Sequence, residues 1–493
     1  MRFLDKTQRA QIGFDFILDE LEVITCYGLD EKKNIKPFKK EEKKQLMQEL
    51  TDVEKIIKGL NNKDYYYRKI EGIFFKIKDI RNSIKRCKEL NTLDDVELYE
   101  IKTFAKLISE IIEIMDKLEL DIPELKFFNL RQVYKILDPE NKNIPTFYIY
   151  DAYSTKLKDF RNQKRILEEK IIKQNDEDVI KQLKDERLNY VILEEQEELN
   201  IRKDLTKKIE KFTDSIENNI KCIGKLDLLI SKAKLAVKYN GIKPSICDEM
   251  SINLKNSVNP EVKMILEKKN KEFTPISIEL KEGVSVITGA NMGGKTITLK
   301  TVVLNVYLAN LGFFVFSEYA RIPIVDFIQF ISDDMQSITK GLSTFGAEII
   351  NLNKVIECAK RGNGLIVLDE FARGTNPKEG SYLVKALSRY LNRLKSMSLI
   401  STHYDGVVES DMVHYQVIGL KNINFNSLKQ KIDLNKRFSV EIIQQHMDYR
   451  LEKISQHSEV PKDALNIALL LGIEKGISDI VKDIYAEGDV YGK

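Results

Sequence analysis

The chain has 493 residues, 43% of them hydrophobic and 31% charged, which is enough for about two to four domains with a large core. Its 79 Lys and Arg nearly cancel 76 Asp and Glu, and the net charge of +3 excludes the overall basic excess that often marks non-specific DNA binders. The five cysteines are scattered and include no CxxC pair, which favours reduced thiols and argues against a zinc site.

The first part of the chain has the sequence pattern of helices. Its N-terminus carries charges without the apolar stretch of a signal peptide, and no apolar run approaches the roughly 18 residues that span a bilayer. We therefore expect a cytoplasmic protein with no membrane partner. Leu, Ile and Phe recur at helical spacing, as in Phe14, Ile17, Leu18 and Leu21, which share one helical face. This pattern predicts an all-α core domain over residues 1–150.

Residues 151–243 predict a long helical hairpin that resembles a lever or clamp. Between Ala152 and Ala236 the chain contains no proline and a single glycine, Gly224. The polar stretch 175–178 is where two long helices would fold back. Charges of both signs are mixed near this turn, and the dense Lys and Arg cluster of a DNA-gripping tip is missing. Such charges usually mark only a solvated helix surface.

The composition changes at Pro244. Short apolar segments then alternate with helical ones, which predicts a mainly parallel sheet flanked by helices. We expect an α/β domain over residues 244–425 and a C-terminal helical dimerisation segment over residues 426–493. The apolar segments taken as strands are residues 284–288, 313–316, 365–369 and 398–402.

The segment GANMGGKT, residues 289–296, fits the pattern G-x-x-x-x-G-K-[ST] of a phosphate-binding loop. It follows an apolar strand and precedes a helical run, which is the context that this motif requires. Glycines let successive backbone N–H groups point at phosphate oxygens, and a helix N-terminus favours negative charge. Lys295 would place its charge on the β- and γ-phosphates, and the Thr296 hydroxyl would bind Mg²⁺. The predicted ATP-binding residues are Gly289, Ala290, Asn291, Met292, Gly293, Gly294, Lys295 and Thr296.

A second motif places Asp369 and Glu370 at the end of the apolar strand that begins at Leu365. Ligands bind at the carboxyl ends of strands in open α/β sheets, so both acids would face the nucleotide. We expect Asp369 to hold Mg²⁺ through water and Glu370 to orient or deprotonate the attacking water. His403 follows the next strand and can sense the γ-phosphate or polarise the water. Glu370 and His403 are the predicted catalytic residues.

Ser343 lies in the segment KGLSTF, residues 340–345. A Ser at a helix start can present its hydroxyl and N–H groups to an anion, although a plain helix cap is the better explanation when the segment is taken alone. The turn 374–377 could shape a subunit contact.

Together these motifs resemble the MutS family of ATPases. The family's phosphate-binding loop usually reads GPNMGGKS or GPNTGGKT, and its STF, DE-x-x-x-GT and THY signatures are matched by residues 343–345, 369–375 and 402–404. The order and spacing agree across roughly residues 273–420. The resemblance implies an α/β P-loop ATPase with a parallel sheet of the ATP-binding-cassette and MutS type, preceded by an all-α core and lever domain with a helical hairpin.

The same resemblance implies a homodimer that uses ATP and Mg²⁺ at two composite sites. Ser343 of one subunit would reach the γ-phosphate held by Lys295 of the other. Hydrolysis would then loosen the dimer and move the helical arms.

The chain departs from the family pattern in several places. We expect a short form that lacks the mismatch-reading domain and the nuclease tail. The family's Phe-x-Glu wedge occurs only at Phe316-Ser317-Glu318, inside the α/β domain, and its Arg-His-Pro is replaced around Asn259-Pro260. The helical half agrees with the family's core, lever and clamp domains only in its general helical sequence pattern.

Three functions remain open on these grounds. By family, the ATPase would act on mismatched or branched DNA in DNA repair. Alternatively, the chain resembles the reactivating ATPase of cobalamin-dependent lysine 5,6-aminomutase, which opens its enzyme to release damaged cofactor. The balanced charge and the missing wedge fit that second function. A nucleotide-gated scaffold with little turnover is disfavoured by Glu370 and His403.

Overall fold

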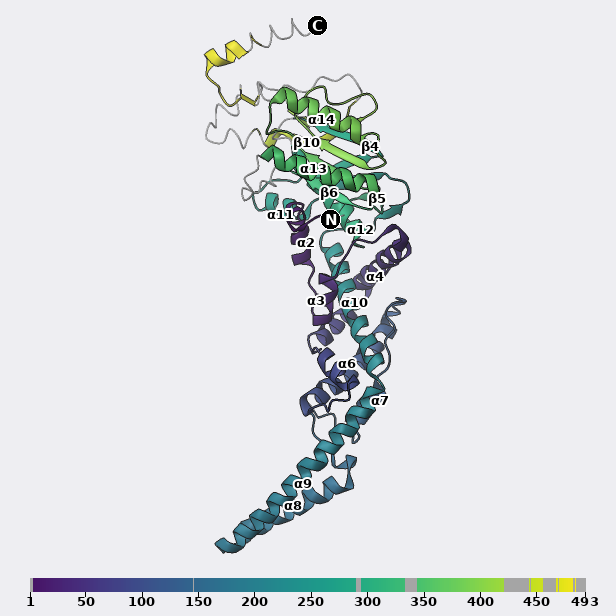
Figure 1. Cartoon of the computed structure of the whole chain (residues 1–493), viewed down its shortest axis with the longest axis vertical. Helices are drawn as coiled ribbons and strands as arrows, with labels where there is room; N and C mark the ends of the chain where they lie inside the picture. The colour runs from purple at the N-terminus through teal and green to yellow at the C-terminus, as the bar shows by residue number, and fades with distance from the viewer. Residues whose placement is uncertain are drawn as a thin grey trace. The chain divides into compact units, whose positions relative to one another are not determined.

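A computed structural model shows a chain of many helices and two β-sheets (Figure 1). The structure describes residues 3–144, 146–289, 294–332, 344–420, 443, 445–454, 467–468, 470–481 and 484. No helix among these residues is long and apolar enough to cross a membrane.

Two compact units divide the chain, and each is built from separate stretches of sequence. The sheet unit consists of Met1–Leu21, Lys36–Thr51 and Lys234–Lys493, and the helical unit consists of Glu22–Ile35 and Asp52–Ala233. Two N-terminal stretches therefore belong with the sheets, although their own sequence is helical. The four-part division expected from the sequence stays a prediction.

The larger sheet has the strand order β10-β9-β4-β8-β7-β6. All neighbours pair in parallel except β10, which runs antiparallel to β9. Its central strands β4, β7 and β8 are buried along their whole length, because both faces are covered by helices. The strands are β4 (Gly283–Thr288), β6 (Ile328–Ile331), β7 (Leu365–Asp369), β8 (Met397–Ser401), β9 (Val413–Gly419) and β10 (Asp448–Lys453).

Helices α13 (Thr344–Arg361) and α14 (Pro377–Leu391) cover one face of this sheet, as Figure 1 shows. Their apolar side chains share a buried core with alternate residues of β4, β7 and β8, such as Val286 and Leu368. Helix α12 (Lys295–Asn310) packs on the other face. Its Thr296 hydroxyl donates a hydrogen bond to Asp369, and Asp369 points to the face opposite Leu368 because successive side chains of a strand alternate between faces. The carboxyl ends of β4 and β7 thus meet the start of α12.

The smaller sheet has the order β1-β5-β2-β3 and completes the sheet unit together with short helices. The N-terminal helix α1 is attached to the larger sheet, because Gln8 Nε2 donates a 2.6 Å hydrogen bond to the Phe330 carbonyl in β6. The remaining elements of this unit are α1 (Lys6–Gln11), α2 (Phe14–Glu20), η1 (Lys40–Glu42), β1 (Ser245–Cys247), β2 (Ile252–Ser257), α11 (Pro260–Glu267), β3 (Ile276–Leu280) and β5 (Tyr319–Pro323).

The helical unit contains an antiparallel hairpin of α8 and α9 (Figure 1). The Asp176 carboxylate caps α9 by accepting from the Asp178 N–H at 3.0 Å. Ion pairs cross the hairpin, and Arg161 near its base contacts Glu194 and Glu198 at 3.0 and 2.8 Å. The helices, two of which continue into the sheet unit, are α3 (Cys26–Lys33), α4 (Lys43–Phe74), α5 (Arg81–Lys88), α6 (Asp95–Leu118), α7 (Arg131–Leu137), η2 (Asp151–Tyr153), α8 (Thr155–Lys173), α9 (Glu177–Glu210) and α10 (Thr213–Lys238).

Candidate active site

The connection from β4 to α12 begins and ends with a glycine in the left-handed region. Gly289 has φ of 130° and Gly294 has φ of 77°, conformations that side chains with a Cβ rarely adopt. A Cβ at Gly289 would lie 3.1 Å from the Val417 side chain, and one at Gly294 would lie 3.1 Å from the Tyr449 ring. Both backbone path and close packing therefore require glycine at these ends. Ala290, Asn291, Met292 and Gly293 lie outside the described residues.

Lys295 is the first residue of α12, and its side chain is only 3% exposed. Its ammonium donates a 2.6 Å hydrogen bond to the Gly289 carbonyl and lies 3.5 Å from Glu370 Oε1. Burial lowers the pKa of this ammonium, and the nearby Glu370 carboxylate opposes that shift. The Lys295 ammonium is thus held at the β4–α12 connection, where it could bind an anion.

Thr296 and Ser401 both donate to the Asp369 carboxylate. The Thr296 hydroxyl lies 2.7 Å from Oδ2, and the Ser401 hydroxyl lies 2.6 Å from Oδ1. Burial raises the pKa of Asp369, while these two hydrogen bonds lower it. Ser401 has this position because β7 and β8 are parallel neighbours in which Asp369 pairs with Ser401. The sequence did not predict the contribution of Ser401; only the strand order reveals it.

A hydroxyl and a carboxylate oxygen side by side are ligand types that Mg²⁺ accepts. Thr296 and Asp369 therefore fit such an ion chemically. Among the described residues no group of three or more His, Cys, Asp or Glu could hold a metal by itself. A magnesium ion here would need further oxygens from phosphates and water, as is usual for nucleotide-bound Mg²⁺.

Glu370 has a strained backbone that aims its carboxylate at two cations. Its φ is 49°, in the left-handed region, and its N–H donates to the Ser401 carbonyl at 3.2 Å. The carboxylate lies 3.5 Å from the Lys295 ammonium and 2.8 Å from Arg373 Nη1. Ala372, with φ of 63°, is strained in the same way. Strain of this kind clusters at functional sites. The sequence did not predict the contact of Glu370 with Arg373.

His403 is an exposed residue just after the end of β8. Desolvation lowers the pKa of its imidazole, so the neutral ring dominates at neutral pH. Its ring centroid lies 4.3 Å from that of Tyr404, whose hydroxyl donates to the Ala372 carbonyl at 2.9 Å. The Glu370 carboxylate and the Lys295 ammonium both act on His403 electrostatically. A neutral imidazole at this edge can accept or donate a hydrogen bond.

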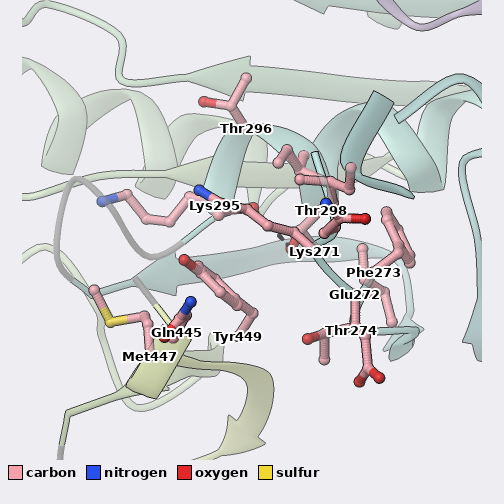
Figure 2. Close-up of a pocket in the computed structure, with 15 residues that line it drawn as sticks. Lys271, Glu272, Phe273, Thr274, Lys295, Thr296, Thr298, Gln445, Met447 and Tyr449 are labelled. Carbon is pink, nitrogen blue, oxygen red and sulfur yellow. Dashed lines mark hydrogen bonds between the residues drawn. The ribbon is translucent and has the colours of Figure 1, made fainter. Parts of the chain in front are cut away.

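A cavity of about 730 Å³ extends from the start of α12 toward β10 (Figure 2). Lys295 and Thr296 line it at one end, and Phe273, Met447 and Tyr449 contribute apolar surface. Its size and mixed lining are those of a site for a small organic molecule that carries an anionic part. Sequence motifs gave no sign of Tyr449, which reaches the cavity from a strand far along the chain.

The structure brings together the described residues that the motifs predicted. Gly289, Gly294, Lys295 and Thr296 lie at the β4–α12 connection, and the two acids lie at the end of the neighbouring β7–β8 pair. Ser343 lies outside the described residues, so its proposed reach across a dimer stays a prediction.

Comparison with known proteins gives a consistent result. Residues 285–471 match the family model "MutS domain V". Endonuclease MutS2 of Caldanaerobacter subterraneus is 27% identical over 79% of this chain and 58% of its own length. Endonuclease MutS2 of Caldicellulosiruptor saccharolyticus is 37% identical over 43% of this chain and 26% of its own. The DNA mismatch repair protein MutS of Carboxydothermus hydrogenoformans is 32% identical over 44% of this chain and 26% of its own length. The chain thus covers less than two thirds of each of these relatives.

Proposed function

We propose that the chain, whose residues 285–471 match MutS domain V, is a P-loop ATPase of the MutS family that hydrolyses ATP to ADP and phosphate. The observation that carries the proposal is the 2.7 Å hydrogen bond between Thr296 and Asp369. It joins the end of the predicted phosphate-binding loop to the end of the predicted acidic strand. Two motifs separated by some seventy residues of sequence thereby form one site.

Phosphates would lie against the β4–α12 connection, where the helix N-terminus and the Lys295 ammonium favour negative charge. Lys295 would exchange its contact with Glu370 for the β- and γ-phosphates. Thr296 would bind Mg²⁺ directly and Asp369 through water. The bound ion would neutralise charge that develops on the phosphates.

Glu370 would hold the attacking water for in-line displacement and accept its proton. Arg373, 2.8 Å from the carboxylate, would keep it oriented after Lys295 moves to the phosphates. The neutral imidazole of His403 would hydrogen-bond the water or the γ-phosphate. These roles for Glu370 and His403 are the ones that the sequence predicted.

Tyr449 and Phe273 suit the nucleotide base, because they give the cavity apolar faces near the phosphate end. We expect Tyr449→Ala to weaken ATP binding about tenfold, the scale of one lost aromatic stacking contact, with little effect on kcat. Equilibrium titration with a fluorescent ATP analogue gives the Kd, and steady-state hydrolysis gives kcat.

Tyr449→Phe keeps the ring and its packing against the cluster around Met447 and should keep the affinity, which separates the role of the ring from that of the hydroxyl. Tyr319→Ala, at an exposed aromatic of the same unit, is the matched control. An unchanged Kd in a folded Tyr449→Ala protein would place the base elsewhere.

We further propose a homodimer with composite sites, in which Ser343 completes the site built around Lys295 of the other subunit. Ser343→Ala and Lys295→Ala should each be inactive alone. After random subunit exchange their mixture should recover about a quarter of wild-type activity, because half of the dimers would carry one intact site. Titrating one variant into the other and following phosphate release measures this. Full activity of Ser343→Ala by itself would refute a role for that residue.

The partner that the ATPase moves is proposed to be mismatched or branched DNA. The names of its relatives, a DNA mismatch repair protein and two MutS2 endonucleases, support this proposal. Stimulation of ATP hydrolysis by such DNA tests it.

One observation favours a second candidate, reactivation of a cobalamin-dependent aminomutase. The hairpin helices α8 and α9, from Thr155 to Glu210, carry fourteen Lys or Arg and fourteen Asp or Glu. Exposed Leu188, Ile192 and Leu199 lie along α9. A neutral arm with apolar side chains fits a protein surface better than a phosphate backbone.

A further inference from the structure

One face of helix α4, near its C-terminal end, carries exposed aromatic and basic side chains. Tyr65 is 63% exposed and Phe75 is 75% exposed. Positions three, four, seven, ten and eleven residues apart fall on one helical face. The buried face of the same segment consists of Tyr67, Ile70, Ile73 and Phe74. We call the exposed set the α4 stripe, and its members are Tyr65, Arg68, Lys69, Gly72, Phe75 and Lys76.

The α4 stripe lies on a distinct part of the helix. Non-helical backbone at Lys63, with φ of −135°, interrupts α4 just before Tyr65. Beyond the helix end at Phe74, the Phe75 N–H still donates to the Glu71 carbonyl at 3.1 Å, so helical spacing extends to Phe75, and Lys76 follows in a tighter turn in which its N–H donates to the Ile73 carbonyl at 2.9 Å. Gly72 lies midway, and a Cβ there would meet no atom within 4 Å. The stripe is therefore an open surface with low relief at its centre.

Positive charge is concentrated around this surface. The α4 stripe itself includes three basic residues, Arg68, Lys69 and Lys76, and no Asp or Glu, in a chain whose charges otherwise nearly cancel. Arg68 Nε lies 2.6 Å from Asp64, which partly neutralises it. The Lys69 ammonium lies 4.5 Å from the centre of the Tyr65 ring. Lys69 and Lys76 are thus the cations best placed to meet an anionic ligand, each next to an exposed aromatic ring.

An anionic polymer with flat aromatic faces matches this surface. Single-stranded nucleic acids bind proteins by stacking bases on aromatic side chains while cations contact the phosphates. Ten residues of helix separate Tyr65 from Phe75, about 15 Å at 1.5 Å per residue. That length corresponds to about four nucleotides at 3.4 Å each. In a duplex the base faces are stacked on one another, so they could not stack on the two aromatic rings.

We propose that the α4 stripe binds single-stranded nucleic acid, with bases on Tyr65 and Phe75 and phosphates on Lys69 and Lys76. This proposal deepens the action on DNA proposed above and rests on it only for the choice of DNA over RNA. Its test needs no nucleotide hydrolysis, so a failure of the stripe and a failure of the ATPase proposal are distinguishable.

The test is binding of the full chain to fluorescent oligothymidylate and oligouridylate, each about 15 nucleotides long, by anisotropy at several salt concentrations. Tyr65→Ala and Phe75→Ala should each weaken binding about tenfold at every salt concentration. Lys69→Glu with Lys76→Glu should weaken binding and reduce the slope of log affinity against log salt by about 1.4, or 0.7 for each lost phosphate contact. The tighter of the two oligonucleotides identifies the natural polymer.

Matched controls lie elsewhere in the helical unit. Phe128→Ala removes an aromatic side chain that is 50% exposed, and Lys170→Glu with Lys181→Glu reverses two charges on the α8–α9 hairpin. These variants should bind like the wild type, and all stripe variants should keep the basal ATPase rate. Three results would overturn the proposal: binding unaffected by Tyr65→Ala and Phe75→Ala, duplex bound as tightly as single strand, or oligonucleotide displaced equally well by polyglutamate. The last result would assign the stripe to acidic peptides.

Discussion

Lys295→Ala should reduce ATP hydrolysis by about a thousandfold, the scale of removing a preorganised charge from developing negative charge in a transition state. The ammonium is buried and held over the β4–α12 connection by the Gly289 carbonyl and Glu370. Among the described residues, the one other cation that lines the cavity is Lys271, which lies toward Phe273. ATP binding should therefore weaken as well. Steady-state phosphate release and titration with a fluorescent ATP analogue measure the two effects.

The control is Lys281→Ala, which removes a 63% exposed lysine of the same unit and should leave both values unchanged. The fold should survive Lys295→Ala, because Glu370 keeps its contact with Arg373. Circular dichroism and thermal melting check this point. Hydrolysis within a few-fold of wild type in a folded Lys295→Ala protein would mean that the catalytic site lies elsewhere.

Glu370→Gln should separate ATP binding from hydrolysis. The amide keeps the size of the side chain but cannot accept the proton of the attacking water, and loss of a general base typically costs about 10²–10⁴-fold in rate. The change also removes a negative charge near the γ-phosphate and weakens the competing contact with Lys295. We therefore expect ATP to bind at least as tightly as in the wild type and to trap the ATP-bound dimer.

Size-exclusion chromatography with light scattering should show this dimer only with ATP and Mg²⁺. Glu379→Gln, at an exposed position of α14, is the matched control and should behave like the wild type. Rapid continued hydrolysis by Glu370→Gln would rule out the assigned role and would leave His403 or a water network as the base.

Local chain geometry explains why much of the candidate site was predictable. The glycine spacing, Lys295 and the acids after β7 depend on a few consecutive residues, and the resemblance to the MutS family is confirmed by the family model. The contacts that complete the site depend on tertiary structure. Ser401 reaches Asp369 only because β8 is the neighbour of β7, and Tyr449 reaches the cavity only through the antiparallel pairing of β10 with β9.

Prediction of the fold was limited in the same way, because strand pairing depends on tertiary structure. Residues 313–316 are apolar and were expected to form a strand, but they are buried without joining either sheet, and Val315 makes only an isolated bridge to Ile242. Apolar composition indicates burial and does not determine hydrogen-bond pairing. Likewise, local sequence cannot show that Gln8 attaches α1 to β6.

The most direct test of the central claim is steady-state ATP hydrolysis with Mg²⁺ in the presence of heteroduplex or branched DNA. A parallel reaction contains a cobalamin-dependent aminomutase with inactivated cofactor in place of the DNA. We predict hydrolysis that DNA stimulates at moderate salt, that Glu370→Gln abolishes and that Glu379→Gln leaves intact. Hydrolysis no faster than that of Glu370→Gln would contradict the ATPase itself. Stimulation by the aminomutase alone would contradict action on DNA and would identify the chain as a reactivating chaperone.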